Sequence, residues 1–346
     1  MTFSKKTQIE TSFNLVFMVF AGAIILLFFA IVIYNLQSSN ASQQETAVVS
    51  ILNSVLSGTR LGQQTSALLQ DFPEGELLIE CAGYSYGTST TNFGSILAYG
   101  PSSTPINPLL IWTHEWQMPF FISNFIYMSS PNIKYIFIHS TSSNSALLKQ
   151  KISSLLPEQL NTQFLTVSQN PSVPGLHHTR FVFLDTDPES YSIPQNFQNE
   201  KTSGIRISAD NQLTFYSFDK QQSSLAATDS HVFYDDATLL SAIVTDSQEY
   251  YDCMLKKSFT RYSQAASSLS LRVSQLKEQR RECSNLYGAI TGSLSENVKA
   301  FVELFNTREL TQQEWAGSVN LFNSLISSLK QLNQESLLQK SCPLIY

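Results

Sequence analysis

Two carboxylates placed directly after an apolar run are the residues whose types and spacing best suit chemistry. Asp185-Thr-Asp187 follows Arg180–Leu184, a segment that predicts a buried strand. Carboxylates at the C-terminal end of such a strand lie where open α/β sheets bind ligands, and their oxygens are the ligands that divalent cations prefer. An Asp followed by Pro after a strand is more often only a turn. We therefore expect no metal, with Asp185 and Asp187 as weak candidates.

The histidines form a second set of possible catalytic or metal-binding residues. His114-Glu115 lies between two tryptophans, and His177-His178 lies in a loop that contains Pro and Gly. A histidine beside a carboxylate can act as a base, and neighbouring histidines can bind a transition metal. A histidine in an aromatic segment is more often a hydrogen-bonded core residue, and a polar pair in such a loop is usually solvated. We expect neither pair to form a site.

Sequence motifs for nucleotides, nucleophilic serine and zinc are absent from the chain. It contains no G-x-G-x-x-G, no G-x-x-x-x-G-K-[ST], no G-x-S-x-G and no H-E-x-x-H. We therefore expect no catalytic residue and no cofactor. The formal net charge is −6, and Lys and Arg are scattered apart from Lys277 to Arg281. Without a basic stripe, nucleic acid is excluded as an expected partner.

An uncharged stretch near the start predicts where the chain resides. Phe13 to Tyr34 are 22 residues without a charge, enough to cross a bilayer as a helix over residues 12–35. A cleaved signal peptide would have a shorter apolar region that ends in a small-x-small site. Lys5 and Lys6 precede the stretch, so residues 1–11 should be cytoplasmic and the rest extracytoplasmic. Asn40 begins a glycosylation sequon just beyond it.

All the cysteines follow this stretch, and an extracytoplasmic, oxidising compartment would let them pair. Their spacing does not match the close pairs that hold zinc. If helices over residues 283–306 and 311–337 form an antiparallel hairpin, Cys283 and Cys342 fall at the same end. A bridge from Cys253 to Cys283 and four free thiols remain open, because spacing does not determine connectivity. The disulfide candidates are Cys81, Cys253, Cys283 and Cys342.

The remaining pattern predicts an α/β fold with three parts outside the membrane. Apolar residues at helical spacing predict an amphipathic stalk over residues 36–62. A strand from Ile133, a helix and two further strands predict a mainly parallel sheet within an α/β domain over residues 63–245. Gly and Pro nearly vanish afterwards, so residues 246–346 should form a helical hairpin region.

Three patches of the chain resemble a group of uncharacterised archaeal single-pass membrane proteins. They are KKTQIETSFNLVFMVFAGAIILLFF, WTHEWQMPFFISNFIYMSSPNIKYIFI and YYDCMLKKSF. The N-terminal patch also resembles that of type IV pilin-like proteins, although no Gly or Ala stands beside Lys5 and Lys6 for a prepilin peptidase. Asp185-Thr-Asp187 is similar to the Asp-x-Asp of nucleotide-sugar glycosyltransferases. The resemblance of the three patches implies an archaeal envelope location and carries no known activity.

We expect a membrane-anchored extracytoplasmic protein with a structural or protein-interaction role in the cell envelope and no catalysis. Its expected partners are the lipid bilayer and other envelope proteins. One alternative is a metal-dependent envelope glycosyltransferase that uses Asp185 and Asp187, and the other is a type IV pilin-like subunit.

Overall fold

The computed structural model describes residues 43–59, 62, 65–199, 201–306, 312–338 and 342–346. Within these residues, no helix combines the length and apolar character needed to cross a membrane. The described part therefore contains no helix corresponding to the transmembrane element of the predicted fold. The predicted span over residues 12–35 and the sequon at Asn40 lie outside the described residues.

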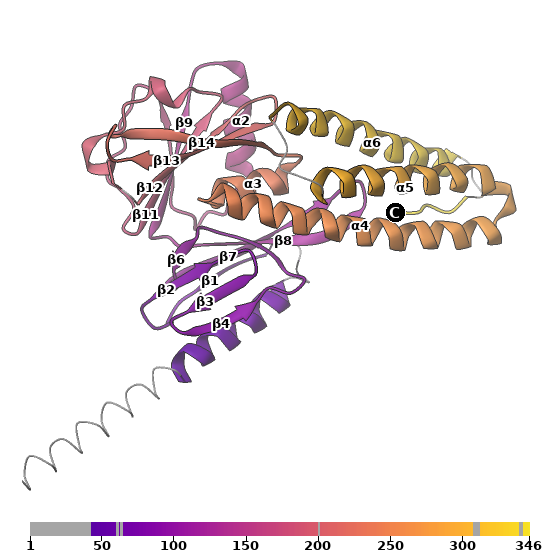
Figure 1. The fold of residues 1–346 in the computed structure, drawn as a ribbon, viewed down its shortest axis with the longest axis horizontal. Helices are drawn as coiled ribbons and strands as arrows, with labels where there is room; N and C mark the ends of the chain where they lie inside the picture. The colour runs from indigo at the N-terminus through magenta and orange to yellow at the C-terminus, as the bar shows by residue number, and fades with distance from the viewer. Residues whose placement is uncertain (1–42, 60–61, 63–64, 200, 307–311, 339–341) are drawn as a thin grey trace, which may run out of the picture.

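Three sheets occur in the described part of the chain, and Figure 1 shows how they are arranged. The first has the strand order β1 (Ser66–Leu69), β7 (Leu109–Gln117), β8 (Phe121–Ser129), β5 (Leu97–Tyr99). The second has the order β4 (Ser89–Asn92), β3 (Gly83–Tyr86), β2 (Glu76–Ile79), β6 (Ser103–Pro105). The third and largest has the order β10 (Thr162–Thr166), β9 (Ile133–His139), β11 (His178–Leu184), β12 (Thr202–Ile207), β13 (Gln212–Asp219), β14 (Ser224–Val232).

The prediction of one mainly parallel sheet is wrong, because most strand pairings are antiparallel. In the largest sheet, β10, β9, β11 and β12 run parallel, while β13 and β14 are added antiparallel. The first sheet has one parallel pair, β5 with β8, and the second is antiparallel throughout. Short turns such as residues 118–120 between β7 and β8 permit only hairpins, since parallel neighbours need a long crossover. The fold is therefore mixed α/β with several sheets.

Two short helices neighbour strands of the largest sheet in sequence. Helix α2 (Ser143–Leu155) connects β9 to β10, and α3 (Asp236–Val244) follows β14. Phe181 and Phe183 of β11 face a separate apolar cluster under the loop that follows this strand, while Val182 and Leu184 face the main core. This alternation buries both faces of β11, which explains its continuous apolar sequence.

The helix over residues 43–59 packs against the second sheet. Leu52 and Leu56 are completely buried in the main core. The Tyr84 hydroxyl of β3 donates to the Val49 carbonyl over 3.3 Å, and Glu45 accepts from the Thr88 backbone N–H over 2.8 Å. Apolar residues four apart on one helical face thus place this helix on β3 and β4.

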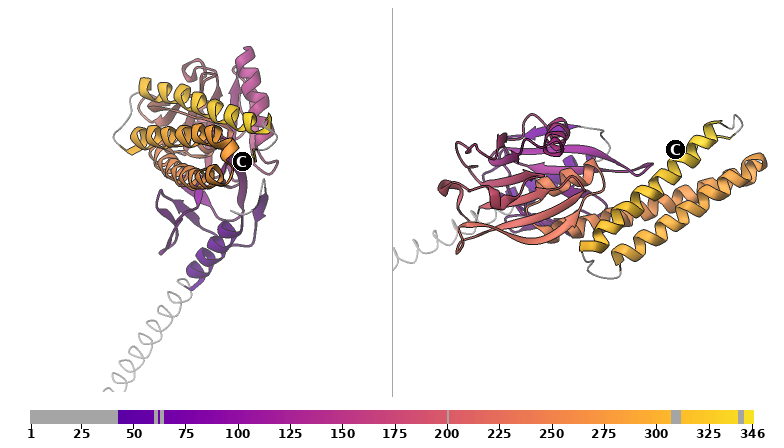
Figure 2. Two further views of the ribbon diagram at one scale, coloured as in Figure 1. Left: turned by 90° about the vertical axis from the view of Figure 1, so that its right-hand side faces the viewer. Right: turned by 90° about the horizontal axis from the view of Figure 1, so that it is seen from above.

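Three long helices form an arm that projects from the sheets (Figures 1 and 2), in which a third helix packs beside the two of the predicted hairpin. They are α4 (Gln248–Gln279), α5 (Ser284–Asn306) and α6 (Gln312–Leu338). Helix α4 alone has 32 residues, and its first half packs on the sheets before its second half enters the arm. Its residues fall within the segment 246–346 that the sequence predicts to be helical. The tail returns along α6, where the Tyr346 hydroxyl donates to the Leu329 carbonyl over 2.8 Å.

Candidate functional site

Asp185 and Asp187 lie at the C-terminal end of β11, where the sequence placed them, and both shape the chain there. Asp185 has a φ of 46°, and its carboxylate accepts from the Ala209 N–H over 3.5 Å. Asp187 caps the 3-10 helix over Pro188–Ser190, accepting from the Glu189 N–H over 3.1 Å. Both carboxylates thus accept backbone N–H groups and stabilise the turn. Among the residues that the structure describes, no three His, Cys, Asp or Glu side chains are grouped to hold a metal ion.

Serine hydroxyls fill the space between the C-terminal ends of β9 and β11, the place where parallel sheets often bind ligands. Ser142 caps α2 by accepting from the Ser145 N–H over 3.2 Å. The buried Ser145 hydroxyl accepts from the Ser140 N–H over 3.0 Å and donates to the Leu184 carbonyl over 2.7 Å. The chain itself thus caps the first turn of α2 and ties it to the end of β11.

The second sheet and the loop before β11 bring together the residue types of a serine-nucleophile triad. His177 Nε2 lies 3.3 Å from the Ser103 hydroxyl of β6, and His177 Nδ1 lies 3.6 Å from a Glu76 oxygen of β2. In acyl-transfer enzymes, a base in this position removes the proton of the serine and is oriented by the carboxylate.

The hydrogen bonds of Ser103, Glu76 and His177 differ from those of a catalytic triad and form a contact between sheets. The Ser103 hydroxyl donates to the other Glu76 oxygen over 2.7 Å, a shorter contact than the one to His177. The neighbouring Ser102 N–H, which could have helped to hold an oxyanion, donates to Asp246 over 2.8 Å. The hydroxyl proton is thus held by the carboxylate, and the group joins the second sheet to the loop before the third.

Beside it, His178, Ser203 and Arg180 form a buried polar chain. Arg180 donates from Nη1 to the Ser203 hydroxyl oxygen over 3.0 Å, so the Ser203 O–H is free to donate to His178 Nε2, 2.8 Å away. Burial and the nearby Arg180 charge favour neutral His178, although Asp246 opposes them, and its pKa is lowered to about 4. The imidazole is therefore an uncharged acceptor at neutral pH.

Arg180 is 1% exposed and ties the third sheet to the end of α3. Its Nη1 also donates to the Gly204 carbonyl over 3.1 Å. Its Nη2 donates to the carbonyls of Ala242 and Thr245, over 3.3 and 2.6 Å. Burial lowers its pKa to about 10, which still leaves the guanidinium charged at neutral pH. A cation at the C-terminal end of a helix stabilises the helix dipole and satisfies carbonyls that have no partner in the helix.

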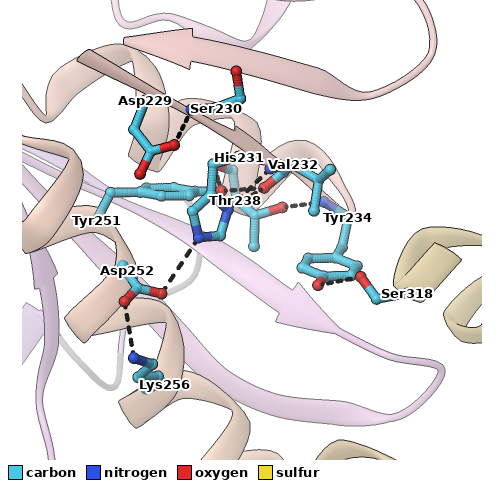
Figure 3. A network of polar contacts seen from close by, with 10 residues as sticks. All are labelled: Asp229, Ser230, His231, Val232, Tyr234, Thr238, Tyr251, Asp252, Lys256 and Ser318. Carbon is cyan, nitrogen blue, oxygen red and sulfur yellow. Dashed lines mark hydrogen bonds and ion pairs between the residues drawn. The ribbon is translucent and has the colours of Figure 1, made fainter. Parts of the chain in front are cut away.

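Figure 3 shows a histidine–aspartate pair between β14 and α4. His231 Nε2 lies 3.3 Å from Asp252, which also pairs with Lys256 over 2.9 Å. His231 Nδ1 accepts from the Val232 N–H over 2.9 Å, so Nε2 carries the proton that points at Asp252. Both ring nitrogens are occupied, and the residue is only 2% exposed. Burial raises the pKa of Asp252, but the hydrogen bonds from His231 and Lys256 outweigh it and the pKa is lowered.

This network continues into the arm and holds α4 and α6 against the sheet. The Tyr251 hydroxyl donates to the Val232 carbonyl over 3.0 Å, and its ring meets the His231 ring edge-on. The Tyr234 and Ser318 hydroxyls lie 2.9 Å apart (Figure 3), which connects the end of β14 to α6. A buried, satisfied histidine of this kind orients packed elements and has no free nitrogen for a substrate.

His114 and Glu115 lie on β7, between the two tryptophans. The neighbouring Trp112 stacks on Tyr127 with ring centroids 5.3 Å apart, and the fully buried Trp116 packs on Phe125. Burial lowers the pKa of His114 against the opposing charges of Asp236 and Glu115. Successive side chains of a strand point to opposite faces, so His114 and Glu115 do not converge on one site.

The structure joins Cys283 to Cys342 and Cys81 to Cys253, so the alternative bridge from Cys253 to Cys283 does not form. The first bridge fixes the tail to the start of α5, as the antiparallel arrangement of α5 and α6 allows. The second bridge links residues 172 positions apart, from the β2–β3 turn to α4. Pairs of this kind form and persist in oxidising compartments.

Sequence reasoning missed the polar groups that the fold assembles from distant segments. Ser103 and His177 are 74 positions apart, and Arg180 and Thr245 are 65 apart. No local motif accompanies either pair. A charged residue inside the apolar run RFVFL was the one signal for Arg180, because a buried charge requires partners. Comparisons with known protein families, curated proteins and solved structures find no match to this chain.

Proposed function

We propose that this chain is an extracytoplasmic protein of the cell envelope with a structural or protein-interaction role. The two disulfides, Cys81–Cys253 and Cys283–Cys342, carry this proposal. Structural bridges between distant elements persist outside the cytoplasm and are rare in reducing compartments. The residues best suited to chemistry make structural hydrogen bonds: Asp185 and Asp187 shape a turn, and both nitrogens of His231 have partners within the chain.

The helical arm supports an interaction role. Both ends of α5 and α6 are held, one by the bridge to Cys342 and the other by the contact between Tyr234 and Ser318. A rigid projection presents a defined surface without the entropy cost of ordering on binding. Leu271 of α4 is 69% exposed on this arm. We place the contact with an envelope partner on the outer side of α4.

Attachment to the lipid bilayer is part of the proposal. The uncharged residues 13–34, which follow Lys5 and Lys6 and lie outside the described residues, support a cytoplasmic N-terminus. Labelling of intact cells with a membrane-impermeant lysine reagent should modify Lys277 and Lys299 but spare Lys5 and Lys6. Labelling restricted to Lys5 and Lys6 would place the domain on the other side of the membrane.

Site-specific photocrosslinking in cells tests the interaction role. A photoreactive amino acid replaces Leu271 in the full chain, with the equally apolar and 87% exposed Leu176 as the matched control. We expect discrete adducts with envelope proteins from Leu271 and none from Leu176. Equal adducts from both positions, or none from either, would contradict a contact made by the arm.

A further inference from the structure

A polar groove lies on the third sheet, beside the short helix that Asp187 caps, and none of its lining residues belongs to the arm or to the Arg180 and His231 networks. Its volume is about 750 Å³, within the range of roughly 300–1,000 Å³ common for small-molecule sites. One wall is the loop that covers Phe181 and Phe183, and the other is the β13–β14 hairpin. The groove is thus bounded by two segments that the fold brings together on one face of the sheet.

Several hydrogen bonds and a buried ring hold the loop wall in place. Gln198 donates from Nε2 to the Ile193 carbonyl over 2.9 Å, and the Tyr191 hydroxyl donates to the Gln169 carbonyl over 3.2 Å. Phe197 is completely buried and meets Phe181 edge-on, with centroids 5.7 Å apart. The loop is therefore anchored at both ends and in the middle, so its groove-lining side chains start from fixed backbone positions.

The hairpin wall is shaped by an Asx turn and by a glycine in the sheet. Asp219 accepts from the Gln221 N–H over 2.8 Å, and Ser223 has a φ of 50°, which turns the chain back into β14. A Cβ added at Gly204 would lie 2.7 Å from Leu225 Cδ1 and 3.3 Å from Tyr216 Cβ. Gly204 therefore lets Leu225 and Tyr216 settle deep enough to form the floor.

The lining chemistry is that of a site for hydroxyl groups. Tyr216 gives an aromatic surface with a hydroxyl at its end, and burial raises the pKa of that hydroxyl so that it stays a donor. The amides of Gln198 and Gln222 can donate and accept at once, as sugar hydroxyls do. The other polar lining groups are Glu189, Ser190, Ser192, Ser223 and Ser224.

We propose that this groove binds a neutral oligosaccharide, with Tyr216 under a sugar ring and Gln198, Gln222 and Glu189 on its hydroxyls. Glu189 is the only charged side chain among the described residues that line the groove, and Asp187 lies beside it in sequence. The Arg206 guanidinium also acts on Tyr216, but the two carboxylates of Asp187 and Glu189 outnumber it, so the net charge beside the groove disfavours an acidic sugar through like-charge repulsion. The proposal goes beyond the envelope role and does not depend on the contact made by the arm.

Saturation-transfer NMR and titration calorimetry on the full-length chain test the proposal. The probes are cellotriose, mannotriose and chitotriose, with trigalacturonic acid as the acidic counterpart and a neutral Gly/Ser peptide as the rival class. Tyr216→Ala removes the platform, and Ala227→Trp fills the groove from an exposed position without removing any core contact. Ala209→Trp adds the same side chain at the exposed far end of the β12–β13 hairpin as the matched control.

We expect saturable binding of at least one neutral trisaccharide, weakened about tenfold or more by Tyr216→Ala and by Ala227→Trp and unchanged by Ala209→Trp. Far-UV circular dichroism shows whether each variant is folded, and Ala227→Trp decides alone if Tyr216→Ala is not. The proposal is overturned by absence of binding of all three neutral sugars, or by binding that Ala227→Trp leaves intact. Stronger binding of trigalacturonic acid or of the peptide overturns the ligand class.

Discussion

Replacing Arg180 by Met should separate the third sheet from the end of α3. The substitution removes the donor from the carbonyls of Gly204, Ala242 and Thr245, which lie 3.1, 3.3 and 2.6 Å from the guanidinium. Each buried acceptor left without a donor costs about 1 kcal/mol or more, and the charge at the helix end adds up to about 2 kcal/mol. Met restores some apolar burial, so we expect a loss of about 3 kcal/mol in unfolding free energy.

Urea denaturation of the purified full-length chain, followed by far-UV circular dichroism, measures this loss. Arg180→Lys keeps the charge but not the planar fork, so its loss should be intermediate. Arg272→Met, at an exposed position of α4, is the matched control and should change the unfolding free energy by less than about 0.5 kcal/mol. If Arg180→Met is no worse than Arg272→Met, Arg180 does not bridge the sheet and the helix.

Three further predictions concern the Cys283–Cys342 bridge, the titration of His178 and two glycines. Replacing both Cys283 and Cys342 by Ser opens a loop with a sequence separation of 59 and should lower the unfolding free energy by about 4 kcal/mol in non-reducing urea denaturation. The pKa of His178 falls from 6.5 to about 4 on folding, so the unfolded state binds more protons between these values and stability falls as pH drops through this window. The wild type should lose up to about 3 kcal/mol more than His178→Gln between pH 6.5 and 4 in the same assay, and parallel pH profiles would contradict this. Gly83→Ala should lower the unfolding free energy by about 2–3 kcal/mol, because its Cβ would lie 1.9 Å from the Thr91 carbonyl oxygen. Gly292→Ala, which has open space on α5, should raise the unfolding free energy by about 0.5–1 kcal/mol. Equal thermal midpoints for the two variants would refute the reasoning.

Local patterns explain which parts of the fold were predictable. The continuous apolar run from Ile133 predicts a buried strand and the segment after it has a helical period of 3.6 residues, and they form β9 and α2. The three-sheet arrangement depends on pairings such as Ser66 with Trp112, which bring together residues far apart in the chain. Short strands such as Ser103–Pro105 have too few residues to show any period. Pairing partners of this kind are set by tertiary packing.

The candidate sites also differ in whether a local sequence pattern predicts them. Asp185 and Asp187 were placed correctly at a strand end because the strand itself has a strong local pattern. The groove was not predicted, because Gln198 and Tyr216 come from segments joined only by the fold. Gly204 gave no sign of its role, since a glycine inside a strand marks a close approach without saying of what.

Disulfide mapping of the protein taken from its native host tests the proposed extracytoplasmic role most directly. Free thiols are alkylated before the cells are opened, and non-reduced peptides are then identified by mass spectrometry. We predict one peptide pair that joins Cys81 to Cys253 and another that joins Cys283 to Cys342, with no alkylated cysteine. Alkylation of all four residues would place the domain in a reducing compartment and contradict the proposal.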